Sequence, residues 1–230
     1  MTLALASPPE KARTLAGDVL HRLRADIVTC RLKPGSALKF EHLKDAYGAS
    51  FGTLREALTT LAADGLVVSE EQRGFRVAPV SRADLVDLTE ARVLIERQLI
   101  KLSIQNGGDD WEVSTAACLH RMALAAERVS GNVVLNEIWK AAHAQFHEAL
   151  VAASGSPILL GMRATLFKRA ERYRSLSSLV RKIKRSKIDE HRLIMEAAFS
   201  RRIQKTQSLL EDHMRATTAN VLAHAAGIVR

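Results

Sequence analysis

Four of the eight histidines are spaced as the ligands of a single metal ion could be. His143 and His147 are four residues apart, so they share one face of a helix, and two imidazoles at this spacing can bind one divalent ion. His191 and His213 fall on two later predicted helices. Neutral imidazoles suit Zn²⁺ or Ni²⁺. From spacing alone a polar patch on a helix is the stronger interpretation, because eight histidines in 230 residues give such pairs by chance.

The helices that would carry these histidines occupy the C-terminal part of the chain. Apolar periodicity predicts helices at about residues 82–105, 110–129, 132–153, 156–181, 186–200 and 203–225. No strand signal interrupts them, and an antiparallel helical bundle can bring three such helices around one interior point. Ser81 fits the N-cap of the first helix, with Asp84 completing a capping box. We therefore expect an all-α domain over residues 81–230.

The N-terminal part has a different pattern. A first helix is predicted from about residue 14 to 31, with Leu15, Val19, Leu23 and Ile27 as its buried stripe. Two short helices within residues 41–64 flank a tight turn at Gly48, and β-prone runs at 66–69 and 75–78 enclose Gly74. The core face of the two helices would comprise Leu43, Leu54, Ala57, Leu58 and Leu61. The expected fold is thus mainly α, with a winged helix-turn-helix and its β-hairpin wing in residues 1–80.

A winged helix-turn-helix places its second helix in the major groove of DNA. The residues expected at that surface are Lys39, Lys44, Ser50, Phe51, Thr53, Arg55, Arg73, Gly74 and Arg76. Arg55 is the best candidate for pairing with guanine or a phosphate, and the alternative is a surface ion pair with Glu41 or Glu56. Phe51 would either contact a thymine methyl group or pack against its own domain.

Composition is compatible with this interpretation without proving it. The net charge of +9 suits a polyanionic partner, although residues 1–78 carry eleven Lys and Arg against nine Asp and Glu. Cys30 and Cys118 lie far apart and suit reduced, structural thiols. No apolar run approaches the roughly 20 residues of a membrane span, and no signal peptide is evident. We expect a cytoplasmic protein without a membrane partner.

Several motifs resemble one family of regulators. Gly48-Ala49-Ser50, Leu54-Arg55-Glu56-Ala57-Leu58, Asp64-Gly65-Leu66 and Arg73-Gly74 are similar to the DNA-binding domain of GntR-type transcription regulators. The resemblance covers residues 14–80. It departs at Phe51 and Gly52, where that family usually has Arg and Thr. Because that Arg commonly contacts a base, the family's operator preference does not carry over to this chain.

The bundle resembles the FCD effector domain of the FadR subfamily, over about residues 82–220. The similar segments are His143 to His147, residues 153–156, Glu190-His191-Arg192 and Asp212-His213-Met214. The resemblance implies a metal held by an acidic residue and three histidines; His143 stands at the acidic position, so four histidines are expected here. Within the subfamily, the pattern is most similar to the carbon-starvation-induced (CsiR) type.

The resemblance also implies a small carboxylate effector beside the metal. A metal with open positions can take carboxylate oxygens while an arginine binds the other end. Arg92 matches the family's arginine near the start of the bundle, and the alternative for it is an i,i+4 pair with Glu96. Arg169, Arg172 and Tyr173 are further candidates, whose alternative is a solvated basic face.

These observations predict a ligand-controlled transcription regulator, most simply a repressor, that binds a near-palindromic DNA operator as a homodimer. The resemblance rather than any heptad pattern implies the dimer. A His-ligated metalloenzyme is an alternative, but Glu148 directly follows His147, unlike the glutamate of a His-Glu-x-x-His motif, which lies between the two ligands. A nonspecific DNA-packaging protein is the other alternative, suggested only by the charge. We therefore expect a regulator and not an enzyme.

Overall fold

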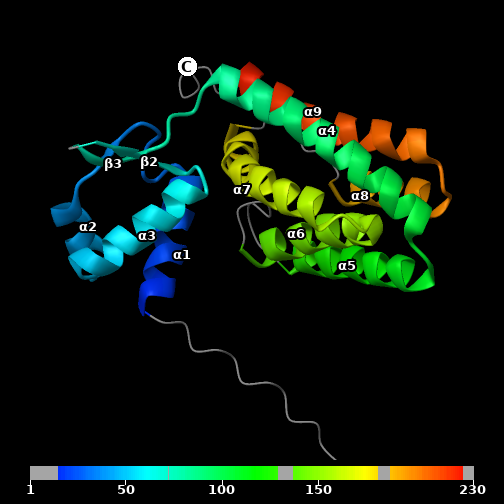
Figure 1. Ribbon diagram of the computed structural model, residues 1–230, viewed down its shortest axis with the longest axis horizontal. Helices are drawn as coiled ribbons and strands as arrows, with labels where there is room; N and C mark the ends of the chain where they lie inside the picture. Colours follow the sequence, from blue (N-terminus) through cyan, green and yellow to red (C-terminus); the bar gives the residue numbers. More distant parts are fainter. Residues whose placement is uncertain (1–14, 72, 129–136, 181–186, 225–230) are drawn as a thin grey trace, which may run out of the picture.

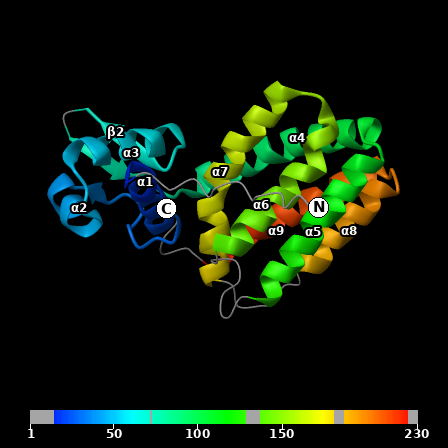
Figure 2. The same ribbon diagram turned by 90° about the horizontal axis from the view of Figure 1, so that it is seen from below.

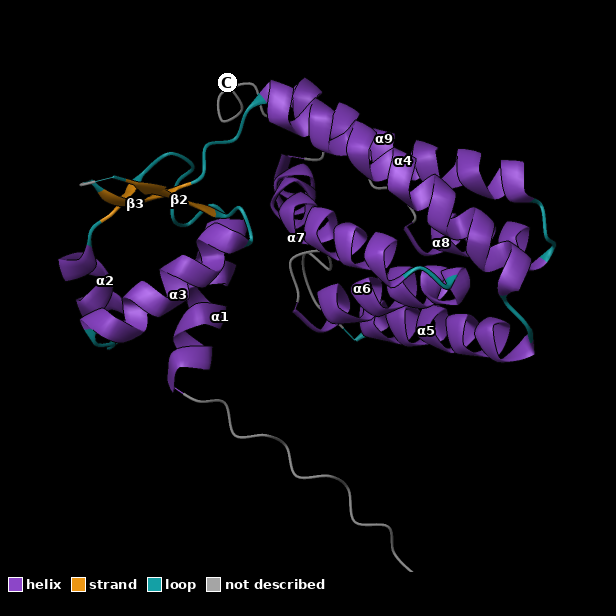
Figure 3. Ribbon diagram, viewed as in Figure 1, coloured by secondary structure: helices purple, strands orange, loops and turns teal. Residues whose placement is uncertain are grey.

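The computed structural model describes residues 15–71, 73–128, 137–180 and 187–224. Figure 1 shows a smaller N-terminal part of short helices and strands beside a larger bundle of long helices. Coloured by secondary structure in Figure 3, the strands are confined to the N-terminal part, and helices dominate the rest. The predicted fold class, a winged helix-turn-helix followed by an all-α bundle, is confirmed.

The N-terminal part contains three helices and a small sheet. The elements are α1 (Leu15–Val28), β1 (Ala37–Leu38), α2 (Phe40–Tyr47), α3 (Phe51–Ala63), β2 (Val67–Glu70) and β3 (Gly74–Val77). The strand order is β1-β3-β2, and both pairings are antiparallel. The two-residue strand β1 was not predicted. The expectation that Leu15 is buried was wrong, because it stands at the first residue of α1 and is 63% exposed, whereas Val19, Leu23 and Ile27 are fully buried.

Local signals fix the two helices of the helix-turn-helix. Gly48 ends α2 with φ +63°, a left-handed conformation that glycine adopts without strain, and its N–H donates to the Lys44 carbonyl. Ser50 then caps α3, its hydroxyl accepting a hydrogen bond from the Thr53 N–H at 3.2 Å. All five residues predicted for the core face of α2 and α3 are buried. The second helix is therefore held at a fixed angle on a separate apolar core.

The C-terminal part is a bundle of long helices. It comprises α4 (Arg82–Asn106), α5 (Asp109–Glu127), α6 (Glu137–Val151), α7 (Pro157–Val180), α8 (Lys187–Phe199) and α9 (Ile203–His224), with a 3-10 turn at Ala152–Ser154. Ser81 caps α4 by accepting from the Asp84 N–H at 2.9 Å. The Asp84 carboxylate does not complete the predicted capping box. It accepts hydrogen bonds from Arg169 and Tyr173 instead.

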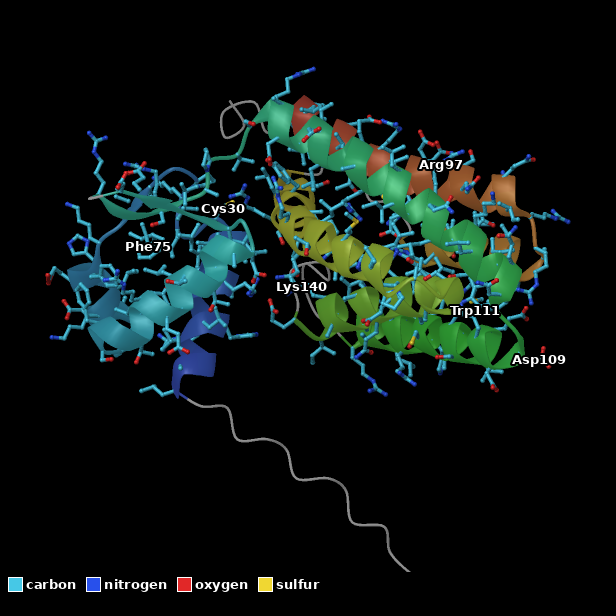
Figure 4. All side chains as sticks on the ribbon, viewed as in Figure 1. Cys30, Phe75, Arg97, Asp109, Trp111 and Lys140 are labelled. Atoms are coloured by element: carbon cyan, nitrogen blue, oxygen red, sulfur yellow. The ribbon has the colours of Figure 1, made fainter. Side chains whose placement is uncertain are left out.

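The bundle has its own apolar core, to which α4, α5, α6, α8 and α9 contribute. Trp111 lies near the end of this core that is farthest from the N-terminal part (Figure 4), and its indole N–H donates to the carbonyls of Ala149 and Leu150. Among the described helices, none combines the length and the apolar character needed to cross a membrane.

A third, smaller apolar cluster lies at the junction of the two parts. It includes Val80, Leu85, Ala170, Tyr173 and Leu176, with Cys30 packed against it. Figure 2 shows α7 between the N-terminal part and the other helices of the bundle. The break between β3 and α4 falls where the sequence predicts a domain boundary, and the division into domains 1–80 and 81–230 stays a prediction.

Candidate functional site: a histidine cluster beside buried arginines

Four histidines from three helices meet in the interior of the bundle. His143 and His147 come from α6, His191 from α8 and His213 from α9. One ring nitrogen from each lies within 4.8 Å of those of the others. His143, His147 and His191 are buried, and the side chain of His213 is 12% exposed. The four histidines that the family resemblance singled out therefore converge in the structure.

The cluster favours neutral imidazoles. Burial lowers the pKa of His143 and His147 well below the ordinary histidine value, and the nearby Arg174, His191 and His213 lower both values further. Neutral rings keep a lone pair, which a metal ligand needs. A hydrogen bond of 3.0 Å joins Nε2 of His147 to Nε2 of His191, and the tautomers of the two rings decide which nitrogen donates.

The donor set suits a transition metal such as Zn²⁺ or Ni²⁺. Two nitrogens that each lie about 2.1 Å from one ion can be at most about 4.2 Å apart, so small ring rotations would bring all four within reach of one ion. Glu190 accepts a hydrogen bond from Nδ1 of His213 at 3.0 Å. A carboxylate in this position orients a metal-binding imidazole.

Three arginines converge on one aromatic ring next to the histidines. The guanidinium carbons of Arg92, Arg163 and Arg174 lie 5.7, 5.1 and 4.9 Å from the centroid of the Phe167 ring. That ring is 5.9 Å from the His147 ring. Arg174 also donates to Nδ1 of His143 at 2.9 Å. Arg163, Arg174 and Phe167 were not predicted, because only the packing of α7 against α4 and α9 brings them here.

These arginines are incompletely neutralised. Arg163 pairs with buried Glu96 at 3.1 Å, and Arg174 lies 3.6 Å from Glu171. Arg92 forms no ion pair with any described residue, and its buried Nε has no hydrogen-bond partner there. Burial lowers the pKa of Arg92 to about 10. Glu96 raises this pKa, whereas the nearby Arg174 and Arg163 lower it. The alternative of an Arg92–Glu96 pair is not formed, since Glu96 pairs with Arg163.

Arg169, Arg172 and Tyr173 lie elsewhere on α7, at the junction. Arg172 is buried and donates to the carbonyls of Ala78 and Pro79 at 2.6 and 3.0 Å. Arg169 and the Tyr173 hydroxyl both bond Asp84, at 2.7 and 2.6 Å. These side chains form hydrogen bonds to the connecting segment and to Asp84 at the start of α4. Their predicted effector role stays a prediction, but the structure does not place them with the histidines.

The predicted DNA surface has one group of exposed cations. Lys39, Lys44, Arg55 and Arg73 are exposed, and within the described residues none of their side chains forms an ion pair. The alternative pair of Arg55 with Glu41 or Glu56 is therefore not formed. Gly74 has φ +83° at the start of β3, and a Cβ there would meet nothing within 4 Å, so the wing tip can approach a partner closely.

Other residues of that predicted surface are engaged within the N-terminal part. The Ser50 and Thr53 hydroxyl oxygens lie 3.0 Å apart at the start of α3. Arg76 pairs with Glu70 at 3.0 Å and donates to the Gly35 carbonyl. Arg76 thus ties the wing to the loop before β1.

A helix-turn-helix with exposed cations, joined to an all-helical bundle, is typical of a DNA-binding regulator. The family models agree with this class. Residues 15–77 match the "Bacterial regulatory proteins, gntR family" model, and residues 87–216 match the FCD domain. The chain belongs to the GntR family of transcription regulators and carries an FCD domain.

Curated relatives are regulators of the same kind. The chain is 36% identical to the HTH-type transcriptional regulator BphR of Paraburkholderia xenovorans, over 93% of this chain and 88% of that protein. It is 34% identical to the HTH-type transcriptional repressor GlaR of Escherichia coli, over 86% and 91% of the two chains. The solved structure of E. coli McbR/YncC matches with a TM-score of 0.70 at 21% identity, covering 91% and 98% of the two chains, which supports the fold.

Proposed function

We propose that this protein is a cytoplasmic, homodimeric repressor that binds a near-palindromic operator and responds to a small carboxylate held beside a metal ion. The proposal of an anionic effector rests on one observation, the surplus of buried positive charge around Phe167. Among the residues that the structure describes, three guanidinium groups lie there with two carboxylates, Glu96 and the less buried Glu171. An uncompensated buried cation is costly, so an anion would bind favourably.

The ligand chemistry follows from the residues present. The histidines would hold a Zn²⁺ or Ni²⁺ ion, which supplies a positive centre for carboxylate oxygens. Arg92, with an unpaired buried Nε, would bind a second anionic group of the same molecule. A short dicarboxylate would satisfy both ends. GlaR is named a repressor, and that relative supports the repressor part of the proposal.

The helix α7 offers a route from effector to DNA. It carries Arg163, Phe167 and Arg174 beside the histidines, and Arg169 and Arg172 at the junction. The side chain of Lys168, on the same helix, lies 3.5 Å from Asp64 at the end of α3. An effector that displaces Arg174 from His143 would shift α7 and so change the hold on the N-terminal part. In a dimer this would change the spacing of the two recognition helices.

Two experiments test this function. The first is a mobility-shift assay with the full-length protein and the DNA upstream of its own gene; no retardation at low salt would exclude a regulator of that region. The second screens mono- and dicarboxylates against the metal-loaded protein by thermal shift. We expect a dicarboxylate to raise the melting temperature of wild-type protein and not that of Arg92→Met. If Arg92→Met responds like wild type, the effector site is misplaced.

A further inference from the structure

Three phenylalanines form an aromatic surface at the start of the recognition helix. Phe40 opens α2, Phe51 opens α3 and Phe75 lies on β3. The Phe40 and Phe51 rings are stacked, with centroids 4.0 Å apart and an interplanar angle of 18°. Phe75 meets the Phe40 ring edge-on at 6.1 Å. Figure 4 shows Phe75 within the N-terminal part.

The three rings differ in exposure. Phe40 and Phe75 are partly buried and pack against the core of the N-terminal part. Phe51 is 56% exposed. One face of its ring is therefore supported by Phe40 while much of the side chain remains open to solvent. A large apolar side chain that is both held in place and exposed is suited to an apolar partner.

The position of Phe51 on α3 puts it among the DNA-facing residues. It directly follows the cap Ser50, and the first turn of a recognition helix reaches the base edges. Arg55 is one helical turn further and lies on the same exposed face. Between them, Gly52 has no side chain, and a Cβ there would meet only the Ser50 hydroxyl at 3.9 Å. The backbone beside Phe51 can therefore come close to DNA.

We propose that Phe51 reads the C5-methyl group of a thymine in the major groove and that Phe40 is a positioning residue which fixes the ring. Thymine is the unmodified base that presents a methyl group in this groove, and phenylalanine is one of the side chains that contact it. Arg55 would meet a guanine or a phosphate next to it. This inference names the specificity of the proposed operator binding and rests on that function.

A different contact is conceivable for an exposed phenylalanine. Proteins that kink DNA insert such rings between base steps. A wedge depends on unstacking and not on the thymine methyl group. Removing only that methyl group therefore separates the two contacts.

The test begins with operators chosen by the protein itself. Full-length protein selects binding sites from a random duplex library, and each thymine of the best site is then replaced singly by deoxyuridine, which lacks only the methyl group. We expect one position in each half-site to lose affinity about fourfold, the ratio for one buried methyl group. The other thymines should tolerate the change.

Phe51→Ala supplies the coupling measurement. It should bind the thymine site more weakly than wild type, and deoxyuridine at the sensitive position should then have no further effect. Phe51 is more than half exposed and loses only its stacking on Phe40, so the change should lower the melting temperature only slightly. The matched control is Val113→Ala, which removes a 69% exposed apolar side chain from α5 and should keep the full deoxyuridine effect. Phe40→Leu should reduce that effect although Phe51 is intact, and Phe40→Tyr, which keeps the stacked ring, should restore it.

The outcomes are distinct. A deoxyuridine effect that disappears in Phe51→Ala supports the inference. Wild-type binding that ignores every deoxyuridine, selected half-sites without thymine, or an undiminished effect in Phe51→Ala overturns it while leaving sequence-specific binding in place. Failure of the library to yield any preferred site contradicts the proposed function itself.

Discussion

Hydrogen bonds to two of the clustered histidines determine which ring nitrogen each can offer to an ion. Glu190 accepts from Nδ1 of His213, so that Nδ1 carries the proton and Nε2 keeps its lone pair. Arg174 has no lone pair, so Nδ1 of His143 must accept the bond between them. In a neutral His143 the proton is then on Nε2. His213 is thus arranged as a ligand, whereas His143 must first lose its bond to Arg174.

Metal affinity should therefore depend unequally on the four histidines. We expect His213→Ala to weaken Zn²⁺ binding far more than His143→Ala does, and Glu190→Ala to weaken it about 10- to 100-fold, as is usual when the orienting carboxylate is lost. Competition with a chromophoric chelator measures these affinities. His120→Ala, an exposed histidine on α5, should bind like wild type. Equal losses for His143→Ala and His213→Ala would show that the hydrogen bonds do not rank the ligands.

Arg55 is the second residue with a separable role. Its side chain is exposed on α3 and forms no ion pair among the described residues. We expect Arg55→Ala to abolish operator retardation at moderate salt, with a loss of at least about tenfold for each half-site. Metal content should not change, since Arg55 lies outside the bundle. Arg202→Ala, exposed at the turn between α8 and α9, should bind normally; a normal footprint from Arg55→Ala would mean that the recognition surface lies elsewhere.

Among the elements, those set by local chemistry could be predicted from the sequence. Gly48, Ser50 and Gly65 mark the ends of α2 and α3 through backbone conformation and capping, which depend on near neighbours. Strand β1 has only two residues and exists through its pairing with β3, so no local pattern announces it. The prediction that Leu15 is buried was wrong for a similar reason. Periodicity defines a helix face, but only the packed structure shows where along that face the core ends.

The candidate site divides in the same way. Spacing placed only His143 and His147 on one helix face, and the family resemblance added His191 and His213 to the set. The arginines beside them required the register of α7 against α4 and α9, which sequence periodicity does not give. Arg163, Arg172 and Arg174 occupy one helix within twelve positions, yet Arg172 faces the junction and the other two face the histidines. The alternative of a solvated basic face does not describe this helix, because Arg172 is buried at the junction and Arg163 and Arg174 are buried beside the histidines.

The hydrogen bonds from Arg172 of α7 to the connecting segment lead to a prediction. Arg172→Met would remove the hydrogen bonds to the Ala78 and Pro79 carbonyls and leave both without this donor. We expect the free energy of unfolding to fall by about 1–3 kcal/mol. Trypsin should also cut faster at Arg82, the exposed first residue of α4.

The matched control for Arg172→Met is Lys205→Met, which replaces an exposed cation near the start of α9. It should be cut at the wild-type rate, and both variants should retain metal. Unchanged cleavage in Arg172→Met at a temperature well below melting would mean that the junction does not depend on this arginine.

At the scale of the whole molecule, charge is distributed unevenly between the two parts. Residues 1–78 account for only two of the nine net positive charges, because nine acidic residues offset their eleven basic ones. Most of the surplus belongs to the bundle, and α7 carries part of it at the histidine site and the junction. Net charge alone would suggest a nonspecific DNA-packaging protein. The structure instead offers four exposed cations on the helix-turn-helix and wing for phosphates or bases: Lys39, Lys44, Arg55 and Arg73.

The salt dependence of operator binding follows from that small set. Eight contacts in a dimer, if all four cations of each protomer meet DNA, give a slope of about −7 in a plot of log affinity against log salt concentration. Lys44→Gln should make the slope shallower by about 2, since each protomer loses one phosphate contact. Lys101→Gln, which removes an exposed cation from α4, should leave it unchanged because the bundle is not expected to touch DNA. Fluorescence anisotropy with a labelled operator across a salt series measures all three slopes. A wild-type slope much steeper than −7, or one that Lys101→Gln also reduces, would mean that the basic bundle lies on the DNA and that the operator contacts extend beyond the helix-turn-helix.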